Sequence, residues 1–357
     1  EQGTCCSYDT VINIEGGTIT GYNRGIYAHY YSVLNISGGT IQNTHLTNST
    51  DNSVIFIDNR TNVNITGGKI SSPHSYGIVN SSSYVTYTIK NVEIDTWGDG
   101  IVARYGTLNI SDSTITSRAP AYTGMYLQRE NATLNNVTVK SEGTGVTHYI
   151  ETSGTWTLNI NNSDIFGATN GVNINSTGDN YYSNVNIKSS KVEGGTNGVV
   201  SNRSSVTFNI GDNTNAVDIT TPEIIGNTYA IKASPGYLNI YDGVFKANND
   251  SSAIVGTVRA VPSGYDLIDT VETIDEENSK VVTTLKEKEK FWIKEFNSTD
   301  RSIGYNLTAG GDGTFGKMHS EETKEKIRQK AIGRKASEET KKKMSEMRLG
   351  KCSEKQK

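Results

Sequence analysis

Apolar and polar residues alternate in short stretches that recur along most of the chain. The pattern is clearest in VINIEGGTI (11–19), VLNISGGTI (33–41), NVNITGGKI (62–70) and TLNISDSTI (107–115). In each stretch two apolar residues flank an Asn, and a further apolar residue follows five positions after the second. Alternation with period two predicts short β-strands, and the Gly, Asn, Asp and Ser residues between the pieces predict turns.

The second apolar residue of each stretch marks a repeat, with 21 to 30 residues between successive copies. The ten anchor positions are Ile14, Ile36, Ile65, Ile89, Ile110, Leu134, Ile160, Ile187, Ile210 and Ile240. Nine anchors are followed five positions later by another apolar residue, and the Ile210 copy is the exception. A third element, Gly followed by Ile, Val or Met, recurs between the stretches, for example at Gly25-Ile26 and Gly124-Met125.

A single repeat of this kind has no partner for its apolar face, whereas stacked repeats bury the anchors in one continuous core. With one strand spacing per coil, ten coils predict a parallel β-helix roughly 45 to 50 Å long. The Asn between the paired apolar residues points outward in this arrangement, and we expect side-chain amides to form a ladder along that face. The ladder positions are Asn13, Asn35, Asn64, Asn109, Asn159, Asn186, Asn209 and Asn239.

The repeats at about residues 8–258 resemble right-handed parallel β-helix proteins of the pectate-lyase-like (pectin lyase-like) kind. The resemblance implies a mainly β fold: a right-handed solenoid of about ten coils, to which the sequence adds a small, mostly α-helical C-terminal extension. The right-handed sense comes from the family and from the general preference of parallel crossovers. Resemblance at this level specifies architecture more than activity.

Many proteins of this shape cleave or bind polysaccharides, and cleavage requires carboxylates gathered on neighbouring coils. The most suggestive stretch is WGDG (97–100), where Trp97 can stack on a sugar and Asp99 can act as an acid or a metal ligand. The alternative is that Asp99 is a turn residue, because it precedes the recurring Gly. Binding without cleavage would use exposed tyrosines; the candidates are Tyr22, Tyr30, Tyr31, Tyr181 and Tyr182.

Charge divides the chain unevenly. Residues 1–258 carry 13 basic and 20 acidic residues, whereas residues 317–357 carry 14 basic and 7 acidic residues. Such asymmetry indicates a tail that binds nucleic acid or an anionic surface. No run of 18 apolar residues exists, so the sequence predicts no membrane-spanning helix.

The basic tail contains two copies of one pattern, HSEETKEKIRQKAIGRK (319–335) and ASEETKKKMSEMRLGK (336–351). Ser320 and Ser337 suit N-cap positions, and Gly333 and Gly350 suit helix ends, which predicts two short helices. The pair resembles the nuclease-associated modular DNA-binding motif that follows GIY-YIG nuclease domains and tracks DNA. The resemblance implies double-stranded DNA as partner and the contact residues Lys324, Lys326, Arg328, Lys330, Arg334, Lys335, Lys341, Lys342, Lys343 and Arg348. The alternative is a solvated charged tail.

The segment before the tail, EKFWIKEFNSTDRSIGYNLTAGGDG (289–313), resembles the C-terminal part of the catalytic domain of GIY-YIG homing endonucleases. The match consists of Glu-x-x-Trp-Ile followed by Gly-Tyr-Asn and a Gly-Gly pair. In that family the Glu binds the divalent metal, so the resemblance places Mg²⁺ at Glu289 if nuclease activity remains. The paired strands and catalytic Arg of the nuclease are not visible upstream, and we expect no cleavage of DNA.

We therefore predict four parts: a β-helix (1–258), a cap or linker (259–286), a nuclease remnant (287–315) and DNA-binding motifs (316–357). The first function hypothesis is DNA binding by the tail. A second is a secreted or cell-surface β-helix adhesin or glycan-binding protein with an acquired tail, and a third is a polysaccharide lyase or hydrolase. Location stays open because the β-helix suggests the outside of the cell and the tail suggests the inside.

Overall fold

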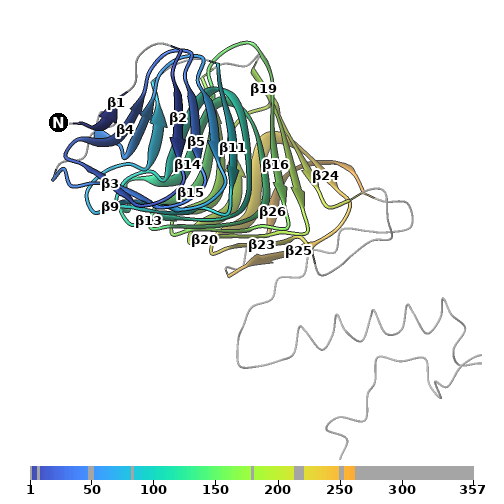
Figure 1. Cartoon of the computed structure of the whole chain (residues 1–357). Helices are drawn as coiled ribbons and strands as arrows, with labels where there is room; N and C mark the ends of the chain where they lie inside the picture. The colour runs from blue at the N-terminus through green and yellow to red at the C-terminus, as the bar shows by residue number, and fades with distance from the viewer. Residues whose placement is uncertain are drawn as a thin grey trace, which may run out of the picture. The chain divides into compact units, whose positions relative to one another are not determined.

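The computed structural model describes residues 2–5, 9–46, 52–81, 84–177, 181–212, 221–248 and 253–261. The chain divides into two units, Glu1–Asn278 and Ser279–Lys357, and the described residues all belong to the first. These residues form a β-solenoid of about ten coils, in which successive coils are stacked in sequence order (Figure 1). The predicted mainly β fold is confirmed for this part, and the predicted helical extension lies outside the described residues.

Each complete coil places one strand, or one part of a longer strand, on each of three faces. The first face carries the predicted Asn-containing stretches, and its strands pair in parallel from one coil to the next. Its members are β2 (Val11–Ile14), β5 (Val33–Ile36), β8 (Asn62–Ile65), β11 (Val85–Lys90), the middle parts of β13 (Ile101–Ser117) and β14 (Thr123–Ser141), β16 (Gly154–Asn161), β19 (Tyr181–Lys188), β22 (Val206–Ile210) and the end of β24 (Tyr229–Ile240).

The second face follows the first along each coil and holds the apolar residue that comes five positions after the anchor. Its strands are also parallel, for example Ile94 beside Ile115 and Ile165 beside Val192. Its members are β3 (Thr18–Gly21), β6 (Thr40–Asn43), β9 (Lys69–Ser72), β12 (Glu93–Thr96), the end parts of β13 and β14, β17 (Asp164–Gly167), β20 (Lys191–Gly194), β23 (Glu223–Gly226) and β25 (Val244–Ala247).

The third face carries the Gly-Ile element and completes the coil. Its members are β1 (Gln2–Cys5), β4 (Arg24–Ala28), β7 (Ile55–Ile57), β10 (Ile78–Asn80), the first parts of β13, β14 and β24, β15 (Thr144–Ile150), β18 (Asn170–Ser176), β21 (Asn197–Ser201) and β26 (Ile254–Ala260). The predicted Gly-Ile, Gly-Val and Gly-Met pairs align in one column, so that Ile78, Ile101 and Met125 are neighbours in register. Periodicity alone therefore located strands on all three faces.

The core is the column of anchors predicted from the sequence. Ile14 pairs with Ile36, Ile36 with Ile65, and the same register continues to Ile210 and Ile240. The anchors inside the stack are buried, with Ile65 and Ile160 completely inaccessible. Full burial of one such side chain is worth about 1.5–3 kcal/mol, so the stacked column supplies the main stabilisation of the solenoid.

The corner between the first and second faces needs backbone with positive φ. In the early coils Gly17, Gly39 and Gly68 occupy this slot, with φ of 81°, 88° and 102°. In later coils the residue with positive φ comes one position earlier, where Asn91 and Asp112 have φ of 54° and 49°. Asn and Asp tolerate this region better than other residues with a Cβ, so the later corners form without Gly at the position with positive φ.

The predicted amide ladder is present on the first face. Asn35 donates to Asn13 at 2.8 Å and Asn64 donates to Asn35 at 2.9 Å. A second run extends from Thr133 through Asn159, Asn186 and Asn209 to Asn239, with amide-to-amide distances of 2.7 Å. The two runs are separated by Thr88 and Asn109. Asn109 was predicted as a ladder position but belongs to neither run, because its register neighbours Thr88 and Thr133 have no side-chain amide.

Candidate functional site

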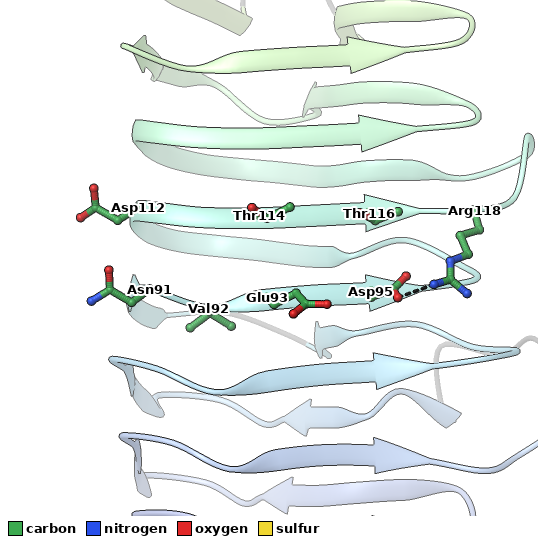
Figure 2. A pocket seen from close by; sticks show the side chains of 8 residues that line it. All are labelled: Asn91, Val92, Glu93, Asp95, Asp112, Thr114, Thr116 and Arg118. Atoms are coloured by element: carbon green, nitrogen blue, oxygen red, sulfur yellow. Dashed lines mark hydrogen bonds and ion pairs between the residues drawn. The ribbon is translucent and has the colours of Figure 1, made fainter. Parts of the chain in front are cut away.

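A groove lies on the outer side of the second face, where β12 and the end of β13 run side by side (Figure 2). It has a volume of about 540 Å³ and is lined by Asn91, Val92, Glu93, Asp95, Asp112, Thr114, Thr116 and Arg118. The register places Glu93 beside Thr114 and Asp95 beside Thr116. The groove is thus bordered by two carboxylates of one coil and two hydroxyls of the next.

Each carboxylate of the groove faces a cation. Glu93 forms an ion pair with Lys69 at 2.6 Å, Asp112 lies 3.7 Å from Lys90, and Asp95 is bonded to Arg118. Figure 2 shows the Asp95–Arg118 contact at one end of the groove and Asp112 at the other. Hydrogen bonding from Asn136 lowers the pKa of Asp112, which favours its ionised form. The groove is therefore strongly polar but close to neutral in charge.

Asp95 has one oxygen without a partner. Its side chain is 19% exposed, and Oδ2 accepts from the Arg118 guanidinium. Oδ1 is buried and accepts no hydrogen bond from any described residue. A buried acceptor without a donor costs free energy, about 1–3 kcal/mol in proteins.

Trp97, which the sequence analysis singled out as a possible sugar-stacking residue, follows β12 directly and does not line the groove. It is two residues after Asp95 and continues the outward alternation of β12 beyond the last residue of the strand. Its carbonyl accepts from Ala119, and the preceding Thr96 carbonyl accepts from Arg118, so the two coils stay paired here. Trp97 is 41% exposed, which places it among the exposed large hydrophobic residues of the described part of the chain.

Asp99 does not line the groove. Its Oδ1 accepts from the backbone amide of Thr123 at 2.6 Å and from the Thr123 hydroxyl at 3.2 Å. Burial raises its pKa to about 6, against the opposing effect of these hydrogen bonds. Asp99 does not adopt positive φ, so the reason for an Asp here is the link that it makes to the next coil and not a left-handed turn.

The third face carries a second group of polar and aromatic side chains near the start of β14. Tyr105 donates to Glu151 at 3.0 Å, Arg129 pairs with Glu151 at 2.7 Å, and the Arg129 guanidinium lies 4.4 Å from the Tyr105 ring centroid. Arg104 donates to Gln128 at 3.1 Å. These groups bond one another across the coils, and their contacts are those expected of a structural network.

A small polar cluster lies inside the solenoid. Glu130 and His148 are completely buried on β14 and β15, and His148 contacts the Ser183 hydroxyl at 3.2 Å through Nδ1. The carboxylate oxygens of Glu130 and the hydroxyl of Tyr87 make no hydrogen bond of normal geometry with a described residue. Burial raises the pKa of Glu130 to about 8, and the nearby amide of Gly106 opposes part of this rise. Burial lowers the pKa of His148 to about 4, so both groups are neutral near pH 7.

The other residues proposed from the sequence lie away from the groove or outside the described residues. Tyr22, Tyr31 and Tyr182 are exposed, as a ligand-binding role requires, but they do not line the groove. Glu289 and all ten predicted DNA contacts lie outside the described residues. Within the described ranges no three His, Cys, Asp or Glu side chains gather as a metal site, and no helix there is long and apolar enough to cross a membrane.

Comparison with known protein families adds one finding in the tail. Residues 314–328 and 333–353 match the NUMOD3 motif. NUMOD3 is a nuclease-associated modular DNA-binding motif linked to homing endonucleases. The two NUMOD3 segments overlap the two copies predicted at 319–335 and 336–351, and they contain every predicted contact except Lys330. No curated protein and no solved structure matches the chain.

The groove was not predicted from the sequence, although the sequence carries a signal for it. Aligning EIDTW (93–97) with TITSR (114–118) on Ile94 and Ile115 places Glu93 beside Thr114 and Asp95 beside Thr116. Asp99, the carboxylate proposed from the sequence, lies at a turn. The residues that line the groove are instead mostly the outward positions of the strands, which alternate with the core.

Proposed function

We propose that the protein binds double-stranded DNA through residues 316–357 and that the β-solenoid is the scaffold that carries this segment. The observation that carries the proposal is the pair of NUMOD3 segments at 314–328 and 333–353. Two consecutive matches to one DNA-binding motif are a stronger indication than a basic composition alone, because charge runs also occur in solvated tails.

The charge distribution supports the same function. Residues 317–357 carry 14 basic and 7 acidic residues, while residues 1–258 carry 13 basic and 20 acidic residues. The acidic part repels a polyanion and the basic part attracts one, so phosphate contacts are expected from the tail. Nine of the ten predicted contact residues fall within the NUMOD3 segments; these are Lys324, Lys326, Arg328, Arg334, Lys335, Lys341, Lys342, Lys343 and Arg348.

We extend this proposal to the solenoid and to the segment before the tail. The solenoid is right-handed and pectate-lyase-like, supported by the repeat and by the general handedness of parallel crossovers. Residues 287–315 are the C-terminal remnant of a GIY-YIG nuclease, supported by their position before the NUMOD3 segments. Glu289 is the residue that would hold Mg²⁺ if nuclease activity remained. The chain does not cut DNA, because one carboxylate supplies neither the nucleophile activation nor the charge stabilisation that hydrolysis needs.

Titration of the full chain into a fluorescently labelled duplex at several salt concentrations tests the proposal. We expect binding whose logarithm of affinity falls linearly with the logarithm of salt concentration, with a slope of about −0.9 per phosphate contacted. A full chain that leaves the duplex unbound at low salt, or whose affinity is the same at low and moderate salt, would falsify DNA binding by the tail.

A further inference from the structure

The first face of the solenoid has an outer side without charge. In the nine coils from β2 to β22, the residues one and three positions before each anchor point outward, and all 18 of them are Asn, Thr or Val. None of these residues is buried, and their strands lie side by side along the stack (Figure 1). We call these 18 positions the uncharged face. Lys, Arg, Asp and Glu are mostly exposed in folded proteins, so their absence over this area requires an explanation.

The second face shows that the fold itself does not exclude charge. Its outward residues flank the inward apolar residue of each strand, and in the same nine coils eight of these 18 positions are charged, among them Lys69, Glu93 and Asp95. The amide ladder explains the Asn residues one position before the anchors. No amide ladder of the described coils runs through the column three positions before the anchors, which is equally free of charge.

We propose that the uncharged face binds the uncharged face of a second copy of this chain, so that two solenoids pack sheet on sheet. Asn and Thr side chains both donate and accept hydrogen bonds, which makes the face complementary to itself. Both copies repeat at the same strand spacing of about 4.8 Å, so the side chains of one copy fit between the rows of the other. Sheets that carry Asn ladders pack against each other in this way in stacked β structures.

Charge favours a second copy over other occupants. Residues 1–258 carry 13 basic and 20 acidic residues, so two copies repel each other least where neither presents a charge. A nucleic acid requires Lys or Arg on its binding surface, and the uncharged face has neither. Lys90 and Lys188, which directly follow their anchors, pair with Asp112 and Asp212 of the same chain at 3.7 and 3.6 Å. A charged protein partner therefore gains little there.

The size of the uncharged face is sufficient for a reversible dimer. Nine coils extend about 40 Å along the stack and the outward residues cover about 13 Å along each strand, so each copy contributes roughly 500 Å². A dimer then buries about 1,000 Å² in total, which is the lower end of the range for specific interfaces. We therefore expect a dimer that dissociates on dilution.

Symmetry identifies the centre of the interface. Two identical faces are related by a twofold axis, which runs either along the stack or across its middle. β13 is the fifth of the nine coils, so both orientations place it opposite its own counterpart. Asn109 is an exposed residue of β13 that belongs to neither ladder run. A charge at Asn109 therefore meets the same charge of the second copy without breaking the ladder.

Sedimentation velocity of the full chain at increasing concentrations tests the inference. The wild type should shift from 38.8 kDa towards twice this mass. Asn109→Lys and Asn109→Glu should each weaken the dimer at least about tenfold, because like charges then face each other. An equimolar mixture of the two variants should recover the dimer, because opposite charges then meet. Added salt should leave the wild-type dimer intact, because no ion pair holds it together.

Thr114→Lys is the matched control, because Thr114 is an exposed outward residue of the same strand on the second face. This variant should dimerise as the wild type does, and circular dichroism should show that all three variants keep the solenoid. A wild type that stays at 38.8 kDa at every concentration, Asn109 variants with wild-type affinity, or a mixture no better than its components would overturn the inference. The Asn109 variants should still bind duplex DNA, so failure here is distinguishable from failure of the proposed DNA binding.

Discussion

The Nε2 atom of His148 lies 3.0 Å from the carbonyl oxygen of Glu130, within a core that is otherwise largely aliphatic. Both side chains are fully buried, and the carboxylate of Glu130 is not satisfied by normal hydrogen bonds from described residues. The solenoid therefore holds a carboxyl group that is neutral at pH 7, and its stability has to depend on the protonation of that group.

Glu130→Gln should remove a pH-dependent loss of stability. The pKa of Glu130 is about 8 in the folded chain against 4.5 ordinarily, so between these values the unfolded chain releases a proton that the folded chain retains. The contribution of Glu130 to stability consequently falls by about 1.4 kcal/mol per pH unit as pH rises from 4.5 to 8. Melting temperatures of wild type and variant at pH 5, 6.5 and 8 measure it.

The difference in melting temperature between the variant and the wild type reports the titration of Glu130 alone, because Asp99 and His148 titrate in both proteins. The melting temperature of the variant relative to the wild type should increase steadily from pH 5 to pH 8. A difference that stays constant over this range would show that Glu130 ionises in the folded chain as readily as in the unfolded one.

Gly124→Ala should destabilise the solenoid by about 1–3 kcal/mol, the usual cost of overpacking a core. A Cβ at this position would lie 2.3 Å from Cγ1 of the buried Val139 and 2.7 Å from the backbone oxygen of Gly145. Urea denaturation measures the change. Gly16→Ala is the control, since a Cβ there meets no heavy atom within 4 Å, and equal midpoints for both variants would contradict the steric explanation.

Asn186→Ala should cost about 1–2 kcal/mol, because it removes two hydrogen bonds of the amide ladder at once. Asn186 donates to Asn159 and accepts from Asn209, both at 2.7 Å. Asn184→Ala on the same strand is the control, because the Asn184 side chain makes no hydrogen bond to a described residue in the structure. Urea midpoints that shift equally in the two variants would show that the ladder does not stabilise the stack.

Replacing Lys341, Lys342 and Lys343 together by Ala should weaken duplex binding and reduce the magnitude of the salt slope. Removing one phosphate contact lowers the slope by about 0.9, so the removal of three corresponds to a change of about 2.7. Fluorescence anisotropy at several salt concentrations gives the slope. The control is Lys140→Ala, which replaces an exposed lysine of the solenoid and should leave the salt slope unchanged. A triple variant with the wild-type slope would exclude Lys341, Lys342 and Lys343 as phosphate contacts.

The fold was predictable because one periodicity controls it. All ten anchors from Ile14 to Ile240 lie in register, and the predicted Asn ladder is formed except at Asn109, whose neighbours Thr88 and Thr133 have no side-chain amide. The copy at Ile210 lacks an apolar residue five positions later, but Ile224 fills that slot between Val192 and Phe245. A longer connection in this coil hid the match, because the slot is defined by position in the coil and not by the number of residues.

On the third face the sequence pattern missed some coils, because Val54, Ala230 and Ala253 stand where other coils have Gly.

The site was harder to predict than the fold. The groove depends on how side chains from two different coils combine, and the outward positions vary freely while the core positions repeat. Anchor spacing identifies which residues are neighbours, but the charges, the unpaired Asp95 oxygen and the hollow itself depend on side-chain positions in three dimensions.

The coil that contains Ile210 and Ile224 has a wider implication for how such a chain diversifies. The strands before and after its long connection keep the same register as those of shorter coils. Loop length at a corner is therefore uncoupled from the pitch of the stack. New segments can be accommodated at such corners while the ladder and the buried column remain intact, so the solenoid is a framework in which surface chemistry changes independently of folding.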